Sequence, residues 1–349
     1  MLICVSIPFE MKCIAKEISL PFRYPFRISK GLKTEQPSLI VQLQYMGKTG
    51  YGEAPAITYY QVTTNQMMEE LQRKLPVLEK FAFTGPERFW HFLHHLFPNN
   101  PFLVCALDMA GWDLFGQLRR TSLLEYWKLN PEDAPVTDYT IGIDEPAVML
   151  QKMKEKPWPV YKVKVGFPGD IECVELLRNS TDARIRVDAN AAWSLDEAIP
   201  KIKALHQLQV EFVEQPLAKD NWEGMEILYK ESPIPIIADE SCVFKEDVKR
   251  CLHHFHGINI KLTKCSGITP ALEMVREARE LGLNVMVGCM NESSIGTAAI
   301  AQIAPLLDYV DMDGPLLLQK DTAAGVQFDY GKIQYQQGFG LCLRDVCFE

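Results

Sequence analysis

After Pro135 the sequence repeats one pattern at intervals of roughly 20–30 residues: a short apolar stretch, a turn and an amphipathic stretch with helical spacing. Eight apolar stretches carry the pattern: "TDYTIGI", "VYKVKVGF", "RIRVDAN", "VEFVEQP", "IPIIADES", "GINIKLTK", "NVMVGCM" and "DYVDMDGP". Strands that alternate with helices in this way form α/β folds, and eight such units can close into a ring. The repeat therefore predicts a modified (β/α)8 barrel of the TIM type.

The sequence before this repeat shows a different pattern of apolar and polar residues. Apolar and polar residues alternate between positions 11 and 60, and Gly47 and Gly50 indicate a hairpin in "SLIVQLQYMGKTGYGEAP". Residues 65–130 then show apolar residues at helical spacing. We predict three parts: an α+β domain over 1–130, the barrel over 131–320, and a C-terminal segment over 321–349 whose hairpin returns to the first domain.

Net charge, cysteine spacing and the apolar stretches indicate where the protein is located and which classes of partner are excluded. The formal net charge is −9 and no cluster of lysines or arginines offsets it, which excludes nucleic acid as a partner. Ten cysteines without C-x-x-C spacing fit the reduced thiols of a cytosol. The stretch "MLICVSIPFEMKC" does not resemble a signal peptide, and no apolar run is long enough to span a bilayer. We expect a cytoplasmic protein without membrane partners, and Met11 offers an alternative start to Met1.

Three successive strands of the repeat end in a carboxylate: Asp188, Glu214 and Asp239, spaced 26 and 25 residues apart. One such residue alone could cap a helix or pair with a basic neighbour. Three in phase with the strands converge at the mouth of a barrel, where they would repel one another unless a cation lay between them. Ligation by oxygen alone favours Mg²⁺ over Zn²⁺, which prefers the His and Cys ligands that these positions lack.

Lysines flank this acidic trio on both sides. Lys162 and Lys164 are two residues apart in one strand, so their side chains share a face, and Lys261 follows one strand after the trio. "KVK" alone would also suit the solvated face of an edge strand. Beside a dication and other amines, however, a lysine pKa can fall to about 7–8 from about 10.4, which suits a general base.

The motifs "KVKVG", "RVDAN", "EFVEQP", "IADES" and "NIKLTKCSGI" together resemble the muconate-lactonising group of the enolase superfamily, and "GYGEAP" resembles its capping domain. The resemblance implies Asp188, Glu214 and Asp239 as Mg²⁺ ligands and Lys164 and Lys261 as an opposed acid/base pair. It also implies that Lys162 binds or polarises a substrate carboxylate. Lys264 is a rival to Lys261, which we prefer because it lies within the strand pattern. None of the seven histidines lies at a strand end, where the mandelate-racemase branch would place one.

Asp311 and Asp313 form a D-x-D pair on the last strand, which resembles the pair that binds the α-ammonium group in dipeptide epimerases. One of them could instead cap the following turn. Thr140 and the Cys289 region are expected to touch the substrate. The resemblance implies an isomerase that epimerises the C-terminal residue of a dipeptide through an enediolate. Three basic residues of the segment 22–31 favour L-Ala-D/L-Glu, a substrate of murein recycling: Arg23, Arg27 and Lys30.

Other functions fit the same scaffold. An o-succinylbenzoate synthase or muconate cycloisomerase type of reaction would use the same metal and lysines, although its dianionic substrates would be repelled by Asp311 and Asp313. A barrel that binds small acids without catalysis is a further alternative. Barrels of this kind often assemble, so we also expect a homo-oligomer.

Overall fold

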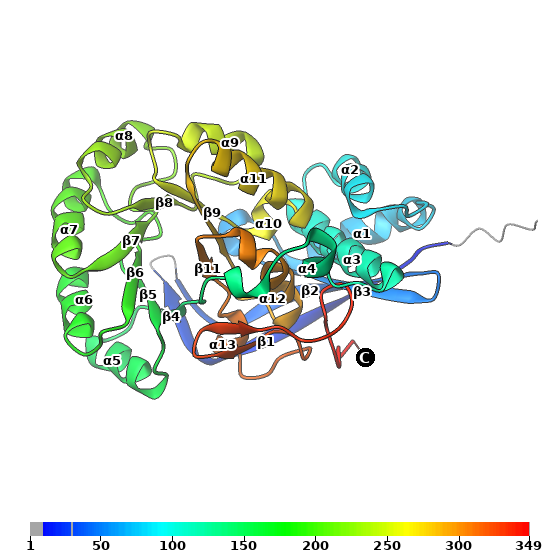
Figure 1. The fold of residues 1–349 in the computed structure, drawn as a ribbon, viewed down its shortest axis with the longest axis horizontal. Coiled ribbons are helices and arrows are strands. Elements are labelled where there is room, and N and C mark those ends of the chain that lie inside the picture. Colours follow the sequence, from blue (N-terminus) through cyan, green and yellow to red (C-terminus); the bar gives the residue numbers. More distant parts are fainter. Residues whose placement is uncertain (1–9, 29–30, 349) are drawn as a thin grey trace, which may run out of the picture.

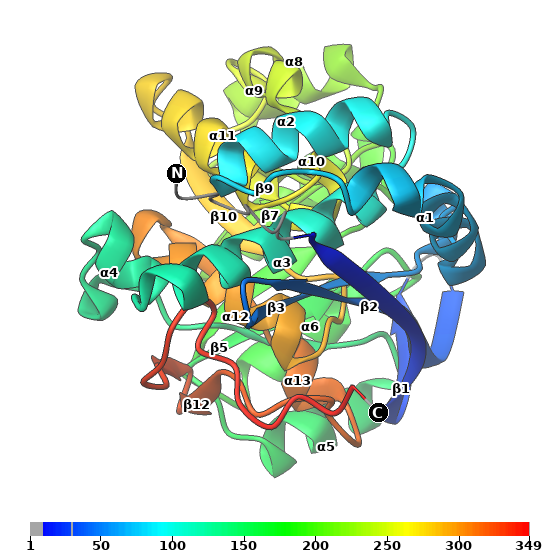
Figure 2. The same cartoon turned by 90° about the vertical axis from the view of Figure 1, so that its right-hand side faces the viewer.

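The computed structural model describes residues 10–28 and 31–348. Its first part is an antiparallel sheet in the order β1-β2-β3, followed by helices. The strands are β1 (Lys12–Ile28), β2 (Gly31–Tyr45) and β3 (Lys48–Pro55), and the helices are α1 (Thr64–Leu78), α2 (Pro86–Leu96), α3 (Pro101–Arg119) and α4 (Leu123–Trp127). We call this part the cap. Figure 2 shows α3 lying along β2 and β3.

The turn between β2 and β3 consists of Met46 and Gly47, whose positive φ angles of 50° and 71° suit a tight two-residue hairpin turn. Gly50 was also expected in this turn, but it lies within β3. A Cβ atom on Gly50 would approach the Ala110 carbonyl oxygen of α3 to 2.2 Å. Gly50 therefore serves the close packing of strand on helix rather than the turn.

Eight parallel strands follow, and each lies in one of the eight predicted stretches, so the predicted barrel is confirmed. The sheet runs in the order β4 to β11 without exchange of neighbours. The strands are β4 (Tyr139–Ile141), β5 (Val160–Lys164), β6 (Arg184–Asp188), β7 (Val210–Glu214), β8 (Ile236–Ala238), β9 (Gly257–Ile260), β10 (Asn284–Gly288) and β11 (Tyr309–Asp311). A parallel bridge between Thr137 and Val310 joins the start of the ring to its end.

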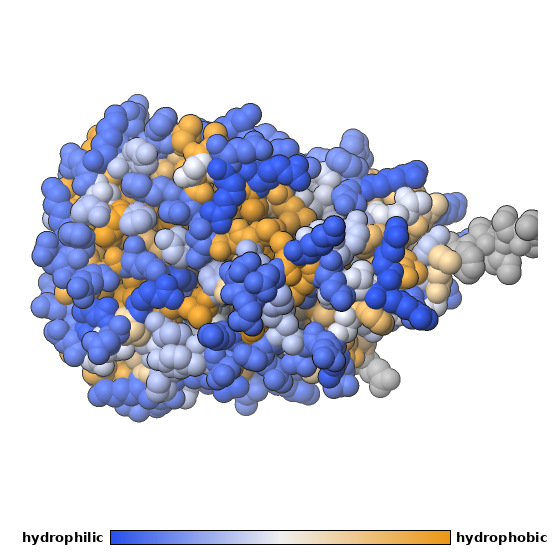
Figure 3. Space-filling model, in the orientation of Figure 1, coloured by the Kyte–Doolittle hydropathy of each residue, from blue (hydrophilic) through white to orange (hydrophobic). Residues whose placement is uncertain are grey.

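Helices cover the outside of the ring, as Figure 1 shows for α5 to α9. The helices that follow the first barrel strand are α5 (Pro146–Glu155), α6 (Asp170–Arg178), α7 (Leu195–Gln207), α8 (Trp222–Glu231), α9 (Lys245–Cys251), α10 (Leu262–Cys265), α11 (Ile268–Glu280), α12 (Ser294–Ile303) and α13 (Gly314–Leu317). Hydrophilic residues dominate the rim of the molecule, whereas hydrophobic residues gather toward the middle of the same face (Figure 3). No helix among the described residues is long and apolar enough to cross a bilayer.

Two buried carboxylates of the cap hold the barrel at the starts of its helices. Asp108 on α3 accepts hydrogen bonds from the Thr269 backbone N–H (3.0 Å) and hydroxyl (2.8 Å) in the first turn of α11. Glu53 on β3 accepts from the Ser293 and Gly296 backbone N–H groups, each at 3.1 Å, at the start of α12. Because the first backbone N–H groups of a helix have no partner within the helix, these hydrogen bonds satisfy them and fix the cap over the barrel.

The C-terminal segment contains an antiparallel hairpin of β12 (Gln327–Asp329) and β13 (Lys332–Gln334). After the hairpin the chain reaches α3, where the Leu341 N–H donates to Asp113 Oδ1 at 2.9 Å. Gly340 pairs with Ser122 just beyond the end of α3. The segment thus contacts the cap, while the exact limits of the three parts stay a prediction.

Candidate active site

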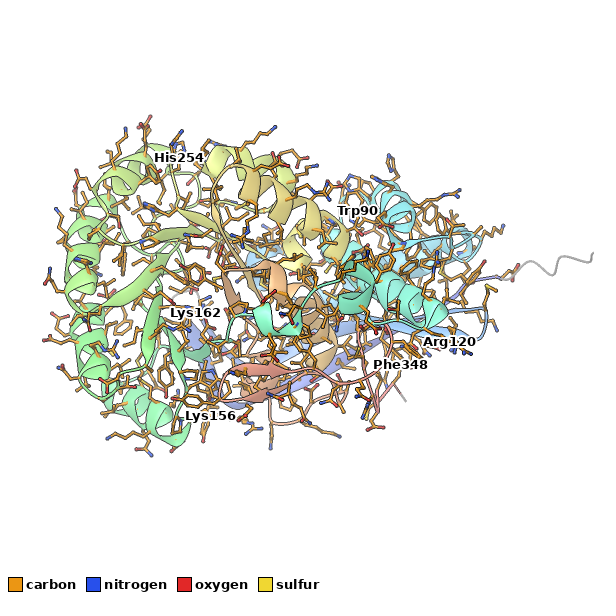
Figure 4. The ribbon with its side chains drawn as sticks, viewed as in Figure 1. Trp90, Arg120, Lys156, Lys162, His254 and Phe348 are labelled. Atoms are coloured by element: carbon orange, nitrogen blue, oxygen red, sulfur yellow. The ribbon has the colours of Figure 1, made fainter. Side chains whose placement is uncertain are left out.

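A cavity opens where the ends of the barrel strands meet the cap. Seven of the predicted site residues line its barrel side or floor: Thr140, Lys164, Asp239, Lys261, Cys289, Asp311 and Asp313. The other three, Lys162, Asp188 and Glu214, are fully buried beneath it. Figure 4 shows Lys162 on the inner side of the strands. The structure therefore gathers all ten residues in one region.

Strand register explains how the acidic trio comes together. Lys164 pairs with Asp188 across β5 and β6, and Asp188 pairs with Glu214 across β6 and β7. Asp239 directly follows β8, the next strand of the ring. Adjacent parallel strands that end in the same layer place these side chains around one edge of the barrel mouth.

Each carboxylate of the trio has one oxygen anchored by a neighbouring group and the other directed at a lysine. The anchoring donors are Asn190 N–H to Asp188 Oδ1 (2.8 Å), Asn259 Nδ2 to Glu214 Oε1 (2.8 Å) and Lys264 Nζ to Asp239 Oδ1 (2.6 Å). The lysine contacts are Lys164 to Asp188 Oδ2 (2.6 Å), Lys162 to Glu214 Oε2 (2.8 Å) and Lys261 to Asp239 Oδ2 (3.0 Å). The trio thus presents three oriented oxygens, each balanced by an ammonium group.

This arrangement fits a hard divalent cation. Three carboxylate oxygens are the ligand type that Mg²⁺ prefers, and anchoring of the second oxygen is the support that metal ligands commonly have. The side chains are not drawn together around one point, because the lysines lie between them. Among the described residues, the three possible metal ligands whose ligand atoms all lie within 4.8 Å of one another are instead Cys289, Asp311 and Asp313.

The pKa values of Asp188 and Glu214 are shifted in opposite directions. Burial raises the pKa of Asp188, but Lys164 and Lys162 outweigh it and hold that pKa at about 2. Burial and the neighbouring Asp188 raise the pKa of Glu214 to about 7 despite the contact with Lys162. Glu214 is therefore the carboxylate whose charge is least compensated, and a cation bound to the trio would favour its ionised form.

The lowered lysine pKa that we expect beside a dication stays a prediction for Lys261. Burial lowers its pKa, but the carboxylate of Asp239 outweighs burial, so the pKa is raised well above its usual value. The expectation assumed a dication beside the amine, whereas here the lysine faces the carboxylate itself.

Lys261 and Lys264 differ clearly in their surroundings. Lys264 is enclosed: its ammonium group donates to Asp239 Oδ1 (2.6 Å) and to the Cys242 carbonyl oxygen (2.9 Å). Lys261 lines the cavity, which favours it over Lys264 for contact with a substrate. It lies directly after Ile260, the last residue of β9, rather than inside the strand as expected.

The D-x-D pair faces the cavity from β11. Asp311 Oδ2 contacts Lys162 Nζ at 2.8 Å, and its Oδ1 is buried with no hydrogen-bond partner among the described residues. Asp313 Oδ2 accepts from the Thr140 N–H at 2.6 Å. Asp313 stands at the start of α13, but its side chain makes no capping hydrogen bond there. Capping of a turn is therefore not what holds the Asp313 carboxylate.

The cap contributes one cavity wall, which we call the cap wall. The segment 22–31 supplies Phe26 and Ile28 to it, and the full set is Phe26, Ile28, Lys33, Ile57, Tyr59 and Tyr60. Arg23 and Arg27 are exposed and do not line the cavity, and Arg23 donates to the Leu318 carbonyl oxygen at 2.8 Å. Lys30 lies outside the described residues. Lys33 was missed, because nothing in its local sequence separates it from the other basic residues nearby.

Comparison with known proteins places this chain in a family. The family model described as "Enolase C-terminal domain-like" matches residues 147–344. The chain belongs to this family. The predicted resemblance to the enolase superfamily is thereby confirmed.

Individual relatives are similar over nearly the whole chain. An L-Ala-D/L-amino acid epimerase of Flavobacterium johnsoniae is 46% identical over 95% of this chain and 100% of its own length. An L-Ala-D/L-Glu epimerase of Bacteroides thetaiotaomicron is 37% identical over 93% and 85%. The solved dipeptide epimerase of Enterococcus faecalis, complexed with Mg and L-Leu-L-Tyr, matches with a TM-score of 0.88 at 28% identity, over 96% of this chain and 99% of that one.

Proposed function

We propose that this chain is a magnesium-dependent dipeptide epimerase, an isomerase that inverts the α-carbon of the C-terminal residue. The relatives named above are epimerases, and the Enterococcus faecalis structure binds Mg and a dipeptide. L-Ala-D/L-Glu is the first substrate to test, because the Bacteroides thetaiotaomicron relative is named for it.

The proposed inversion rests on one observation, which is the position of Lys164 and Lys261 in the ring of strands. Lys164 ends β5 and Lys261 follows β9, four places further along a ring of eight strands. The two lysines therefore approach the cavity from opposite sides. Inversion requires this, because a single base would return the proton to the face from which it came.

In the proposed reaction one lysine removes the α-proton and the other donates a proton to the opposite face. Asp311 and Asp313 accept hydrogen bonds from the substrate ammonium group, and Lys162 stabilises negative charge that develops on the substrate carboxylate. Asp188, Glu214 and Asp239 would hold Mg²⁺, which would supply further positive charge at that carboxylate. Thr140 and Cys289 position the substrate beside the aspartates.

The alternative reactions on this scaffold fit the cavity less well. Dianionic substrates of the o-succinylbenzoate or muconate type would meet two carboxylates at β11, and they have no ammonium group to pair with them. A protein that only binds small acids would not need two lysines on opposite sides of one cavity. We therefore prefer epimerisation.

A dipeptide library incubated with the protein and Mg²⁺ in D₂O tests the proposal. We expect a mass increase of one deuterium and inversion at the C-terminal α-carbon of at least one dipeptide, both abolished by EDTA. The proposal fails if no dipeptide exchanges or inverts with Mg²⁺ present.

Three narrower predictions accompany this proposal: a role in murein recycling, a cytoplasmic location and a homo-oligomeric state. Cell fractionation tests the location, and light scattering of the purified protein tests the oligomeric state. Growth on L-Ala-D-Glu after deletion of the gene tests the role.

A further inference from the structure

Lys33 on β2 projects into the cavity from the cap and is half-buried there. Its ammonium group donates to Gln36 Oε1 at 3.0 Å. Gln36 is fully buried, and its Nε2 donates to the carbonyl oxygens of Pro37 and Ala56, both at 2.8 Å. The amide that holds Lys33 is therefore fixed in orientation, so the ammonium group is positioned by a rigid and neutral acceptor.

This ammonium group has no anionic partner among residues 10–28 and 31–348, since no carboxylate oxygen there lies within 4.0 Å of Lys33 Nζ. Burial lowers the pKa of Lys33, and the ammonium groups of Lys261 and Lys164 lower it further. Glu292 acts in the opposite direction, but burial and Glu53 raise its own pKa to about 7, which limits its negative charge. An anion entering the cavity would offset this unbalanced positive charge.

The rest of the cap wall offers no other cation. Phe26, Ile28 and Ile57 are apolar, and Tyr59 and Tyr60 are neutral aromatic residues. Lys33 lines the same cavity as both proposed bases, Lys164 and Lys261. A substrate α-carbon held between those bases would therefore lie in the cavity that Lys33 lines.

We propose that Lys33 is the specificity-determining residue that pairs with the side-chain carboxylate of the C-terminal substrate residue, so that the protein prefers dipeptides ending in an acidic residue. This inference rests on the proposed function, in which the main-chain carboxylate and the ammonium group already have other partners. It assigns to Lys33 the recognition expected of Arg23, Arg27 and Lys30.

The test compares kcat/KM for L-Ala-L-Glu, its neutral isostere L-Ala-L-Gln and L-Ala-L-Met. We expect the wild-type protein to prefer L-Ala-L-Glu. Lys33→Met should lower kcat/KM for L-Ala-L-Glu by about 10-fold to 100-fold, the effect of losing a charge-assisted hydrogen bond, and change the other two less than about threefold. Lys33→Arg should keep the preference. Lys12→Met, at an exposed cap lysine away from the cavity, is the matched control.

Two outcomes overturn the inference while the proposed function stands. One is equal wild-type turnover of the Glu, Gln and Met dipeptides. The other is an equal loss of all three activities in Lys33→Met, which would assign Lys33 to catalysis or folding. Absence of any wild-type dipeptide turnover overturns the proposed function and the inference together.

Discussion

Lys162 is fully buried, and its ammonium group contacts three carboxylates. Its Nζ lies 2.8 Å from Glu214 Oε2, 2.8 Å from Asp311 Oδ2 and 3.4 Å from Asp188 Oδ2. Burial lowers the pKa of Lys162, but these carboxylates outweigh it and raise the pKa well above its usual value. The single ammonium group of Lys162 therefore contacts two proposed metal ligands, Asp188 and Glu214, and also the proposed substrate-binding residue Asp311.

Replacing Lys162 by methionine should destabilise the metal-free protein by about 3–5 kcal/mol, because buried carboxylates would lose their counter-charge. Saturating Mg²⁺ should restore part of that free energy of unfolding, since a cation that binds the folded state stabilises it. Urea denaturation with and without Mg²⁺ measures both effects.

Lys230→Met is the control for this experiment, because Lys230 forms an exposed pair with Glu226 one helical turn away. Lys230→Met should have the same midpoint of urea denaturation as the wild-type protein, with or without Mg²⁺. Equal stability of Lys162→Met and the wild-type protein would contradict the charge balance described for the site.

At the scale of elements, the site depends on strand ends, and strand ends are what the sequence predicted best. Asp188, Glu214 and Asp239 could be placed on neighbouring strands because their spacing equals the length of one strand–helix unit. Gly50 could not be assigned, because a glycine in a turn and a glycine beneath a packed helix look alike in sequence. Lys33 could not be assigned either, because its contact with the cavity depends on how the cap docks on the barrel.

The contact between α3 and α11 should make stability depend on pH through Asp108. Burial raises the pKa of Asp108 from 3.8 to about 7, even though hydrogen bonds from Thr269 lower it. The folded protein then binds this proton more tightly than the unfolded chain. The contribution of Asp108 to stability is therefore largest in acid and is lost as pH rises from about 4 through about 7.

Urea denaturation of the wild-type protein and Asp108→Asn at pH 5 and pH 8 measures this effect. Asparagine carries no charge at either pH. The free energy of unfolding of the wild-type protein, relative to that of the variant, should therefore be higher at pH 5 than at pH 8. Asp182→Asn, at an exposed position in the barrel, should show no such change. A difference that is constant with pH, or larger at pH 8, would contradict the raised pKa.

For the whole molecule, the cap and the barrel are needed to complete one cavity. The barrel supplies the lysines and carboxylates, and the cap supplies Lys33 and the apolar wall that faces them. The barrel could be predicted because its repeat is local in sequence, whereas the cavity joins residues from β2 to β11 that only the folded chain brings together.

The most direct test of two opposed bases follows the α-proton in D₂O by NMR, with L-Ala-L-Glu and L-Ala-D-Glu as separate substrates. Lys164→Ala and Lys261→Ala should each lower the rate of inversion at the α-carbon by at least about 100-fold. Each should still exchange the α-proton of one stereoisomer, and the two variants should exchange opposite ones. Exchange of the same stereoisomer by both variants, or inversion that survives in either, would contradict the account.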